Sequence, residues 1–407
     1  MKSFNGCEKI FLNILRCALA GERYEGAHSG EEWREIFTLA ELQTLLPVIF
    51  ESVCESAGAR EFPELFKVVK GRVISSVVRQ FNRNLDFHEL YLKMLAAGAR
   101  PLVVKGQLCA ALYPLPDHRI SSDDDIFAAP GEYDICRNVL EWEGLTAEHD
   151  DDGSSHETAY GLNTENGKCL RIELHRTLFA ADAPDDFNRF FTDAFKSCVK
   201  IGDHWSLLPH EHLLYLLAHS FKHFTIVGVG VRQTCDIGLW ARAHFDEIDW
   251  ARLKTELSAI RAFRFAAAQF RLLEDHLGFS FDFPDFWRDE IRMVELEPMI
   301  ADMFDGGAYG NATLTRVHSS TAVQSAVHAD RKGREKGNFL RTLFPSYSYI
   351  AGRFSYVKRF PILLPIGWAE RLIRYALELK NTDSSASGSL QVARERVELL
   401  KYYDVID

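Results

Sequence analysis

The sequence has no long apolar run, no paired-cysteine motif and no excess of positive charge, and each absence argues against a class of protein. No stretch approaches the length of apolar chain that crosses a bilayer. The eight cysteines are scattered without a C-x-x-C motif, so we expect reduced thiols rather than a disulfide framework or a zinc site. The formal net charge is −11, whereas a protein that mainly grips nucleic acid needs a basic surface. We therefore expect no nucleic-acid partner, although a small basic groove is compatible with this charge.

Signals for export and for kinase chemistry are missing as well. Residues 1–6 contain no sustained apolar core, so we expect no signal peptide and a cytoplasmic protein. The chain has neither a glycine-rich phosphate loop nor a His-x-Asp catalytic loop with a following Asn, which argues against a protein kinase. With 407 residues, of which 47% are hydrophobic, the chain is long enough for two or more domains.

Helical periodicity dominates the first part of the chain. Apolar residues recur at helical spacing between residues 10 and 45, and Pro47 is expected to end the second helix. A longer helix is predicted over 66–97, with Gly98 as its cap. The residues expected on the apolar, core-facing side of this helix include Val73, Val77, Phe81, Leu85, Leu92 and Leu95.

The pattern then changes to short strands alternating with short helices. The expected elements are strands over 101–104 and 123–128 and helices over 107–113 and 132–143. A hairpin follows over 156–175, in which Asn166-Gly167 favours a type I′ turn. In its second arm one face carries Leu170, Ile172 and Leu174, and the other carries Arg171, Glu173 and His175.

These patterns divide the chain into five predicted regions. They are a helical N-terminal region (1–98), a mixed core (99–183), a helical region (184–380) with strong helices over 210–224 and 253–277, a serine-rich linker (381–389) and a C-terminal helix (390–407). Within the third region, residues 331–375 mix basic and aromatic side chains. This composition suits a surface for a membrane or a large acceptor, but its prolines favour a buried, kinked connection.

An acidic run opens the second strand of the mixed core. Side chains of a strand alternate between its two faces, so Asp123 and Asp125 project together while Asp124 and Ile126 point the other way. Two carboxylates side by side repel each other unless a cation lies between them. Mg²⁺ prefers such oxygen ligands and keeps positions for water and phosphate. The pair is therefore a candidate Mg²⁺ site, and the alternative is a solvated acidic turn.

The segment around this run resembles the polymerase-beta-like nucleotidyltransferase superfamily, in particular its bacterial branch of nucleotidyltransferase family proteins. The resemblance covers about residues 100–176 and is carried by Lys105-Gly106, Tyr113, Arg119, Ser122-Asp123 and Asp125-Ile126. It implies an α+β fold in which a small mixed sheet with flanking helices, the catalytic core at 99–183, lies between helical N- and C-terminal regions. The sequence departs from the superfamily at Asp124, a position that is normally apolar, and in the longer gap from Gly106 to Asp123.

The resemblance implies a metal-dependent enzyme that moves a nucleoside monophosphate from an NTP to a hydroxyl of a small molecule or protein and releases pyrophosphate. Two Mg²⁺ ions, with Mn²⁺ as an alternative, would stabilise the attacking and leaving oxygens. Asp123 and Asp125 would bridge these ions. Glu173 would be the third ligand and would help to remove the proton of the acceptor.

Nucleotide contacts also follow from the resemblance. Lys105 and Arg119 would bind the triphosphate, with ion pairs to the acidic run as the alternative, and the backbone at Gly106 and Gln107 would donate N–H groups to phosphate. A helix after the third carboxylate would bring His219 and Lys222 to phosphate or base.

Two further side chains on these later helices leave alternatives open. His223 shares a helical face with His219, a spacing that could bind zinc, but no third ligand is evident and structural histidines are favoured. Asp236 would either serve the nucleotide pocket or cap a helix, and capping is favoured. A non-enzymatic alternative for the whole protein is a degenerate binding or regulatory module that keeps the fold without the activity.

Overall fold

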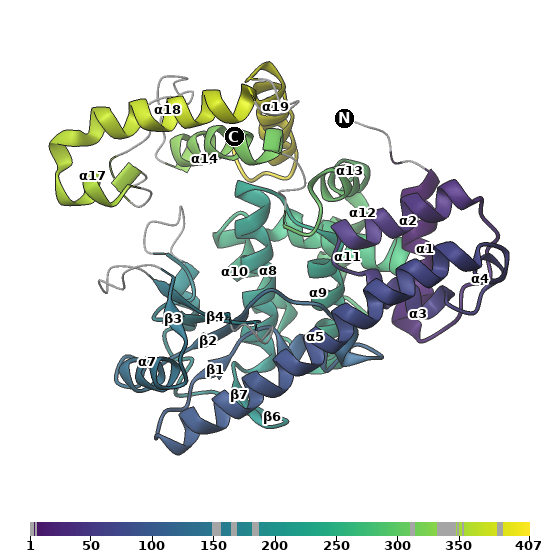
Figure 1. Ribbon diagram of the computed structural model, residues 1–407, viewed down its shortest axis with the longest axis horizontal. Helices are drawn as coiled ribbons and strands as arrows, with labels where there is room; N and C mark the ends of the chain where they lie inside the picture. The colour runs from purple at the N-terminus through teal and green to yellow at the C-terminus, as the bar shows by residue number, and fades with distance from the viewer. Residues whose placement is uncertain are drawn as a thin grey trace.

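The computed structural model describes residues 4, 6–148, 156–163, 169–180, 187–309, 314–331, 347, 350–351, 354–380 and 386–407. Its architecture is α+β, with a small mixed sheet flanked by helices and with helical parts at both ends of the chain, as predicted (Figure 1). No helix in these ranges combines the length and the apolar character needed to span a membrane.

The sheet has five strands in the order β1-β2-β5-β4-β3. Its strands are β1 Leu102–Val103, β2 Asp124–Phe127, β3 Thr146–Ala147, β4 Glu157–Asn163 and β5 Cys169–His175. Only β2 and β5 run parallel; the other neighbours are antiparallel. The predicted hairpin is β4–β5, and the predicted Asn166-Gly167 turn lies outside the described residues. Leu170, Ile172 and Leu174 are buried, so this strand has the apolar face expected from its alternation.

Helices precede and follow the first strands. The N-terminal helices are α1 Gly6–Ala20, α2 Gly30–Leu42, α3 Leu46–Val53, α4 Ala57–Glu61 and α5 Pro63–Ala96, and the short helices around the sheet are α6 Gln107–Ala110, η1 Pro116–His118 and α7 Tyr133–Trp142. Pro47 lies in the first turn of α3 rather than at the end of a helix, a position where its missing N–H costs no hydrogen bond. Figure 1 shows α5 running across the molecule from α3 and α4 to the strands.

The buried face of α5 differs from the predicted one. Val73 is buried, but Phe81, Leu85 and Leu92 are exposed. The side chains that α5 turns toward the protein include Gln80 and Arg83, which are polar and which hydrogen-bond the segment before β2. Val77 and Leu95 are partly buried against the core, so the prediction holds at both ends of the helix and fails in between, where the contacts of α5 are partly polar.

After the sheet, a small hairpin and a helical layer complete the main body. The hairpin, which the sequence did not reveal, is formed by β6 Val199–Ile201 and β7 His204–Ser206. The helices are η2 Phe187–Phe191, α8 Pro209–Ile226, α9 Val231–Ala243, η3 Phe245–Glu247, α10 Trp250–Ala259, α11 Phe263–Leu277, α12 Asp285–Met293 and α13 Glu297–Gly306. The helix predicted over 253–277 is thus two helices, separated at Arg261, whose φ of 56° is not helical.

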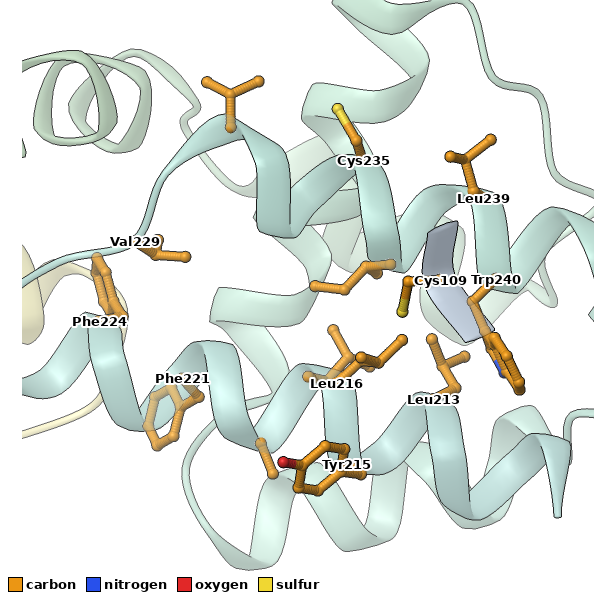
Figure 2. Close-up of a cluster of buried hydrophobic side chains, with 14 of the residues drawn as sticks. Cys109, Leu213, Tyr215, Leu216, Phe221, Phe224, Val229, Cys235, Leu239 and Trp240 are labelled. Atoms are coloured by element: carbon orange, nitrogen blue, oxygen red, sulfur yellow. The ribbon is translucent and has the colours of Figure 1, made fainter. Parts of the chain in front are cut away.

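Helices α8 and α9 form the layer behind the glycine turn. Figure 2 shows the sulfur of Cys109, from α6, among their apolar side chains, including Leu213 of α8 and Trp240 of α9. This contact fixes the position of the turn at Gly106 because α6 begins directly after it.

The C-terminal helices are α14 Leu314–Arg331, α17 Ser355–Arg359, η4 Pro361–Leu363, α18 Leu364–Lys380 and α19 Ala386–Tyr402. Helix α19 begins inside the predicted linker, whose residues 381–385 lie outside the described residues. Phe360, Ile362 and Ile366 are exposed, so the predicted buried connection is wrong for this part of residues 331–375.

Candidate functional site

The parallel pairing of β2 with β5 brings two acidic side chains together. Asp125 is the register partner of Glu173, and His175 lies two residues further along β5 on the same face. One ligand atom from each of these three residues lies within 4.8 Å of the others. The described residues therefore contain a compact group of two carboxylates and one imidazole on the two parallel strands of the sheet.

Asp123 lies beside this group but is not part of it. The residue immediately precedes β2, and its carboxylate is 3.8 Å from the Arg171 guanidinium. The same guanidinium is 3.3 Å from Glu173 and donates two hydrogen bonds to Glu148, at 2.8 and 3.1 Å. Arg171 thus partly neutralises the carboxylates on the open side of the site.

The two carboxylates in the compact group have opposite pKa shifts. Burial together with the negative charges of Asp125 and Asp123 raises the pKa of Glu173 to about 7. Burial would also raise the pKa of Asp125, but Lys105 and His175 hold it well below its usual range. A raised pKa beside other carboxylates shows that these groups repel each other in the absence of a cation.

His175 links the strand pair to β4. Its Nε2 is 3.3 Å from Asp125 Oδ1, and its Nδ1 is 3.3 Å from Glu157 Oε2. Burial disfavours the charged imidazole, but the hydrogen bond to Asp125 and the nearby carboxylates raise the pKa of His175. His156, Glu157 and His175 form a second group with the same close spacing of ligand atoms.

Lys105, next to Gly106, and two histidines of α8 lie near Asp125. Lys105 Nζ is 3.3 Å from Asp125 Oδ2 and 3.4 Å from His219 Nε2. His219 Nε2 is in turn 3.0 Å from His223 Nε2. Burial and the charge of Lys105 lower the pKa of both histidines, that of His223 to about 3, so both are neutral near pH 7. Neither belongs to a group with metal-ligand spacing in the described ranges, which leaves the zinc alternative without support.

Asp124, between the two predicted metal ligands, has a separate role on the other face of β2. Its Oδ2 accepts hydrogen bonds from Nε and Nη2 of Arg83, at 3.0 and 2.8 Å, and both side chains are buried. Arg83 also donates to the backbone carbonyls of Ser121 and Arg171, at 2.9 and 3.2 Å. A single guanidinium from α5 therefore contacts both strands that carry the compact group.

The glycine turn is shaped by the same aspartate. Gly106 has a φ of 52°, a left-handed value that favours glycine, and a Cβ at this position would lie 2.6 Å from Asp124 Oδ1. Gln107 follows it and donates a hydrogen bond to Asn84 on α5, at 2.8 Å. The Lys105-Gly106-Gln107 segment thus reaches Asp125 through Lys105 and lies against Asp124 at Gly106.

Arg119, which was predicted to contact the triphosphate, pairs with a buried carboxylate of α9. Its guanidinium is buried and donates two hydrogen bonds to Asp236, at 2.8 and 2.7 Å, and Tyr113 donates a third at 2.9 Å. Asp236 lies in the middle of α9, so it does not cap a helix. The hydrogen bonds between Arg119 and Asp236 attach the segment before β2 to α9.

Arg232 is a residue of this region that the sequence did not reveal. The side chain is 3% exposed, its Nε makes no hydrogen bond within the described residues, and another of its nitrogens donates to the Ile120 carbonyl. Its guanidinium lies 5.4 Å from the centre of the Tyr309 ring, whose hydroxyl is 3.3 Å from that of Ser122. Because Arg232 is more than 100 residues from the acidic run, only the tertiary structure places this charge near Ser122.

Lys222 lies on α8, partly buried, and its charge contributes to lowering the pKa of Glu157. The pKa of Glu157 is about 2, because the hydrogen bond to His156 and the charge of His175 outweigh the effect of burial. Of the predicted nucleotide contacts, Lys105 lies beside Asp125 and His219, Lys222 interacts with Glu157, and Arg119 pairs with Asp236.

The donor atoms of the compact group fit a divalent cation. Asp125 Oδ2 is buried and makes no hydrogen bond within the described residues, and its close partner there is the Lys105 ammonium at 3.3 Å. Two carboxylates and an imidazole suit Mg²⁺ or Mn²⁺, since both cations take oxygen ligands and Mn²⁺ accepts nitrogen more readily.

Comparison with known proteins gives one match. No curated protein and no solved structure matches the chain. A family model described as "Uncharacterised nucleotidyltransferase" matches residues 29–278, which is more than half of the 407 residues and includes the sheet, the glycine turn and α8 to α11. The chain therefore belongs to this nucleotidyltransferase family.

Proposed function

We propose that the protein is a Mg²⁺- or Mn²⁺-dependent nucleotidyltransferase that moves a nucleoside monophosphate from an NTP to a hydroxyl of a small molecule or a protein. Pyrophosphate is the second product. The observation that carries this proposal is the group of Asp125, Glu173 and His175, whose ligand atoms lie within 4.8 Å of one another on two parallel strands. The family match supports the same class of reaction.

The compact group would hold the cation. Asp125 and Glu173 supply carboxylate oxygens and His175 supplies an imidazole nitrogen, while Asp123, held near Glu173 by Arg171, provides a further carboxylate on the open side. When bound, the cation would stabilise negative charge on the attacking and leaving oxygens of the phosphoryl group. The protein fixes the positions of these ligands before the nucleotide arrives, because the Arg83 guanidinium contacts both strands.

Three cations would hold the phosphates of the nucleotide. Lys105 is next to Asp125, Lys222 is on α8 near Glu157, and Arg232 has a buried nitrogen without a hydrogen bond in the described part of the chain. Lysine and arginine bind phosphate oxygens through charge-assisted hydrogen bonds. Backbone N–H groups at Gly106 and Gln107 would add neutral donors to the same side of the site.

The experiment that tests the proposal compares the wild-type protein with Asp125→Asn. Each labelled NTP is incubated with the protein, Mg²⁺ or Mn²⁺ and a cell extract, and both labelled product and pyrophosphate are measured. We expect Asp125→Asn to lose about 10³-fold in rate, which corresponds to about 4 kcal/mol of activation free energy, and circular dichroism verifies that the variant is folded. Asp282→Asn, which changes an exposed aspartate in the same way, is the matched control and should retain full activity.

A second candidate function is a binding or regulatory module of the same fold without catalytic activity. Two observations favour it: Asp123 lies outside the compact group, and an aspartate occupies the position between the two predicted ligands. Calorimetry distinguishes the candidates. Metal-dependent NTP binding without any release of pyrophosphate would support the module, and equal turnover by Asp125→Asn and the wild type would refute the proposed enzyme.

A further inference from the structure

The segment that leads into β2 is held by side chains from two helices. Arg119 is paired with Asp236 of α9, and the Ile120 carbonyl accepts a hydrogen bond from Arg232 of the same helix. From the α5 side, two side chains hydrogen-bond the N–H and the carbonyl of Ser121, both at 2.9 Å. The backbone of this segment is therefore fixed up to Ser121.

Asp123 follows this segment but lies outside the strand pairing that positions the other carboxylates of the proposed cation site. Strand β2 and its register with β5 begin one residue later, whereas Asp125 and Glu173 are register partners. Arg171 attracts the Asp123 carboxylate from 3.8 Å, which is too long for a hydrogen bond, so this ion pair does not fix its orientation. The Ser122 hydroxyl supplies a directional contact, since it donates a hydrogen bond to Asp123 Oδ2 at 3.0 Å.

Tyr309 reaches Ser122 from a distant part of the chain. Its hydroxyl donates to Ser122 Oγ at 3.3 Å, and the centre of its ring lies 5.4 Å from the Arg232 guanidinium. The Tyr309 hydroxyl, the Ser122 hydroxyl and the Asp123 carboxylate thus form a chain in which each hydroxyl donates to the next group. Burial would raise the pKa of Tyr309, but the charge of Arg232 and the hydrogen bond with Ser122 lower it, which strengthens the phenol as a donor.

The backbone directly before Tyr309 is fixed between α2 and α9. The Ala308 N–H donates to the Leu42 carbonyl of α2 at 2.8 Å, and the Ala308 carbonyl accepts from Gln233 of α9 at 2.7 Å. Gly230 permits this close approach, because a Cβ there would lie 2.5 Å from Ala308 Cα. The packing of two helices therefore determines where the tyrosine lies.

We propose that Tyr309 is a positioning residue of the cation site, which orients the Asp123 carboxylate through Ser122 so that it takes part in holding the divalent ion. A carboxylate that is oriented before the ion arrives loses less side-chain entropy when it binds. The inference rests on the proposed function in assuming that the compact group binds a cation. Tyr309 lies outside residues 29–278, which the family model matches, so the site would depend on a side chain from the region after α13.

The test measures the affinity of the full chain for Mn²⁺, read from the electron paramagnetic resonance signal of the free ion at pH 8 without nucleotide. We expect Tyr309→Phe, which removes only the hydroxyl, to raise the Kd about three- to tenfold, the effect of one hydrogen bond. Tyr347→Phe removes a hydroxyl that donates to the Lys358 carbonyl, also at 3.3 Å, and is the matched control that should leave the Kd unchanged. Circular dichroism verifies that each variant is folded.

A second set of variants tests the route through Ser122. Ser122→Ala should raise the Kd at least as much as Tyr309→Phe, and S122A/Y309F should be no weaker than S122A alone, because either change breaks the same chain. Ser122→Thr keeps a hydroxyl and should retain the wild-type Kd. In Asp123→Asn, the further change Tyr309→Phe should have no effect. A wild-type Kd in Tyr309→Phe, or an equal effect of Tyr309→Phe with and without the Asp123 carboxylate, would refute the proposal.

Turnover separates this inference from the proposed function. Release of pyrophosphate by a wild type whose Mn²⁺ affinity does not depend on Tyr309 would support the enzyme and reject the positioning role. Mn²⁺ binding that weakens in Tyr309→Phe and in Ser122→Ala, without any release of pyrophosphate, would support the positioning role and reject the enzyme.

Discussion

Asp124 and Asp125 are neighbours on one strand, equally buried, yet the two faces of β2 give them different surroundings. Asp124 faces α5, where one oxygen accepts two hydrogen bonds from Arg83. Asp125 faces Lys105, Glu173 and His175. Burial raises the pKa of Asp124 despite its pairing with Arg83, whereas Lys105 and His175 outweigh burial and hold the pKa of Asp125 well below its usual range. The difference lies in how far the surrounding cations offset burial.

A carboxylate that stabilises the fold differs from a carboxylate of the compact group in the charges around it. The charge of Asp124 is balanced by one guanidinium, so its removal leaves an unpaired buried cation. Glu173 has Arg171 at 3.3 Å, but burial and the charges of Asp125 and Asp123 still raise its pKa to about 7, so its negative charge is disfavoured. Removing the carboxylate of Asp124 should therefore destabilise the fold, whereas removing the carboxylate of Glu173 should stabilise it.

The largest effect on stability is expected for Asp124→Asn. Loss of one partner from a buried ion pair costs about 3–5 kcal/mol, because the remaining charge is left in a low-dielectric environment. The free energy of unfolding, measured by urea denaturation, should fall by this amount. The double variant R83M/D124N removes the unpaired charge and should recover part of the loss. Equal stability of Asp124→Asn and the wild type would show that the buried pair contributes nothing.

Glu173→Gln should have the opposite effect. The folded-state pKa of about 7 lies above the ordinary value of 4.5, so ionisation of Glu173 costs stability as pH rises from about 4.5 to 7. Without divalent cations at pH 8, the glutamine variant should be more stable than the wild type by up to roughly 3 kcal/mol. Its unfolding free energy should also depend less on pH across this window. A less stable variant at pH 8 would contradict the proposed repulsion.

Divalent cations should stabilise the folded protein by binding the compact group on the Asp125 face of β2. A ligand that binds only the folded state adds about 2.7 kcal/mol when its concentration is 100 times its Kd. Thermal unfolding of the wild type at pH 8 should therefore shift upward with Mg²⁺ or Mn²⁺, and Asp125→Asn should show no shift. Glu148→Gln, in which the altered carboxylate lies outside the compact group, is a suitable control that should retain the shift. A shift of equal size in Asp125→Asn would place the cation elsewhere.

The smallest effect is expected for Gly106→Ala, which tests how closely the Asp124 face approaches the glycine turn. Alanine at a φ of 52° is strained, and its Cβ would lie 2.6 Å from Asp124 Oδ1. We expect a loss of about 1–3 kcal/mol in the free energy of unfolding. Gly71→Ala in the exposed part of α5 has open space around its Cβ and should be neutral or stabilising.

The strands and the hairpin of the core could be predicted because they depend on residues that are close together in the sequence. Strand alternation predicted that Leu170, Ile172 and Leu174 share a buried face, and the Asn-Gly dipeptide indicated the hairpin of β4 and β5. The same alternation predicted that Asp124 points away from Asp125. The parallel pairing that places Glu173 opposite Asp125 came from the resemblance, since no local pattern determines which strands of a sheet are neighbours.

The contacts that join distant elements could not be predicted in the same way. Arg119 was expected at phosphate, but its partner Asp236 is 117 residues away on a helix whose position depends on the whole fold. Arg232 and Tyr309 are brought to the site by the same long-range packing. In α5, a regular apolar stripe predicted the core face, but Arg83 and Gln80 occupy that face and satisfy their polar groups on the segment before β2. Periodicity shows that a face is apolar, without showing which partner covers it.

The Arg83 side chain links three elements that are far apart in the sequence. It donates to Asp124 on β2 and to the Arg171 carbonyl on β5, at 2.8 and 3.2 Å, from a helix that belongs to neither strand. The backbone pairing of β2 with β5 sets the spacing of Asp125 and Glu173, and the guanidinium attaches both strands to α5. A displacement of α5 should therefore be transmitted to both strands that carry the compact group.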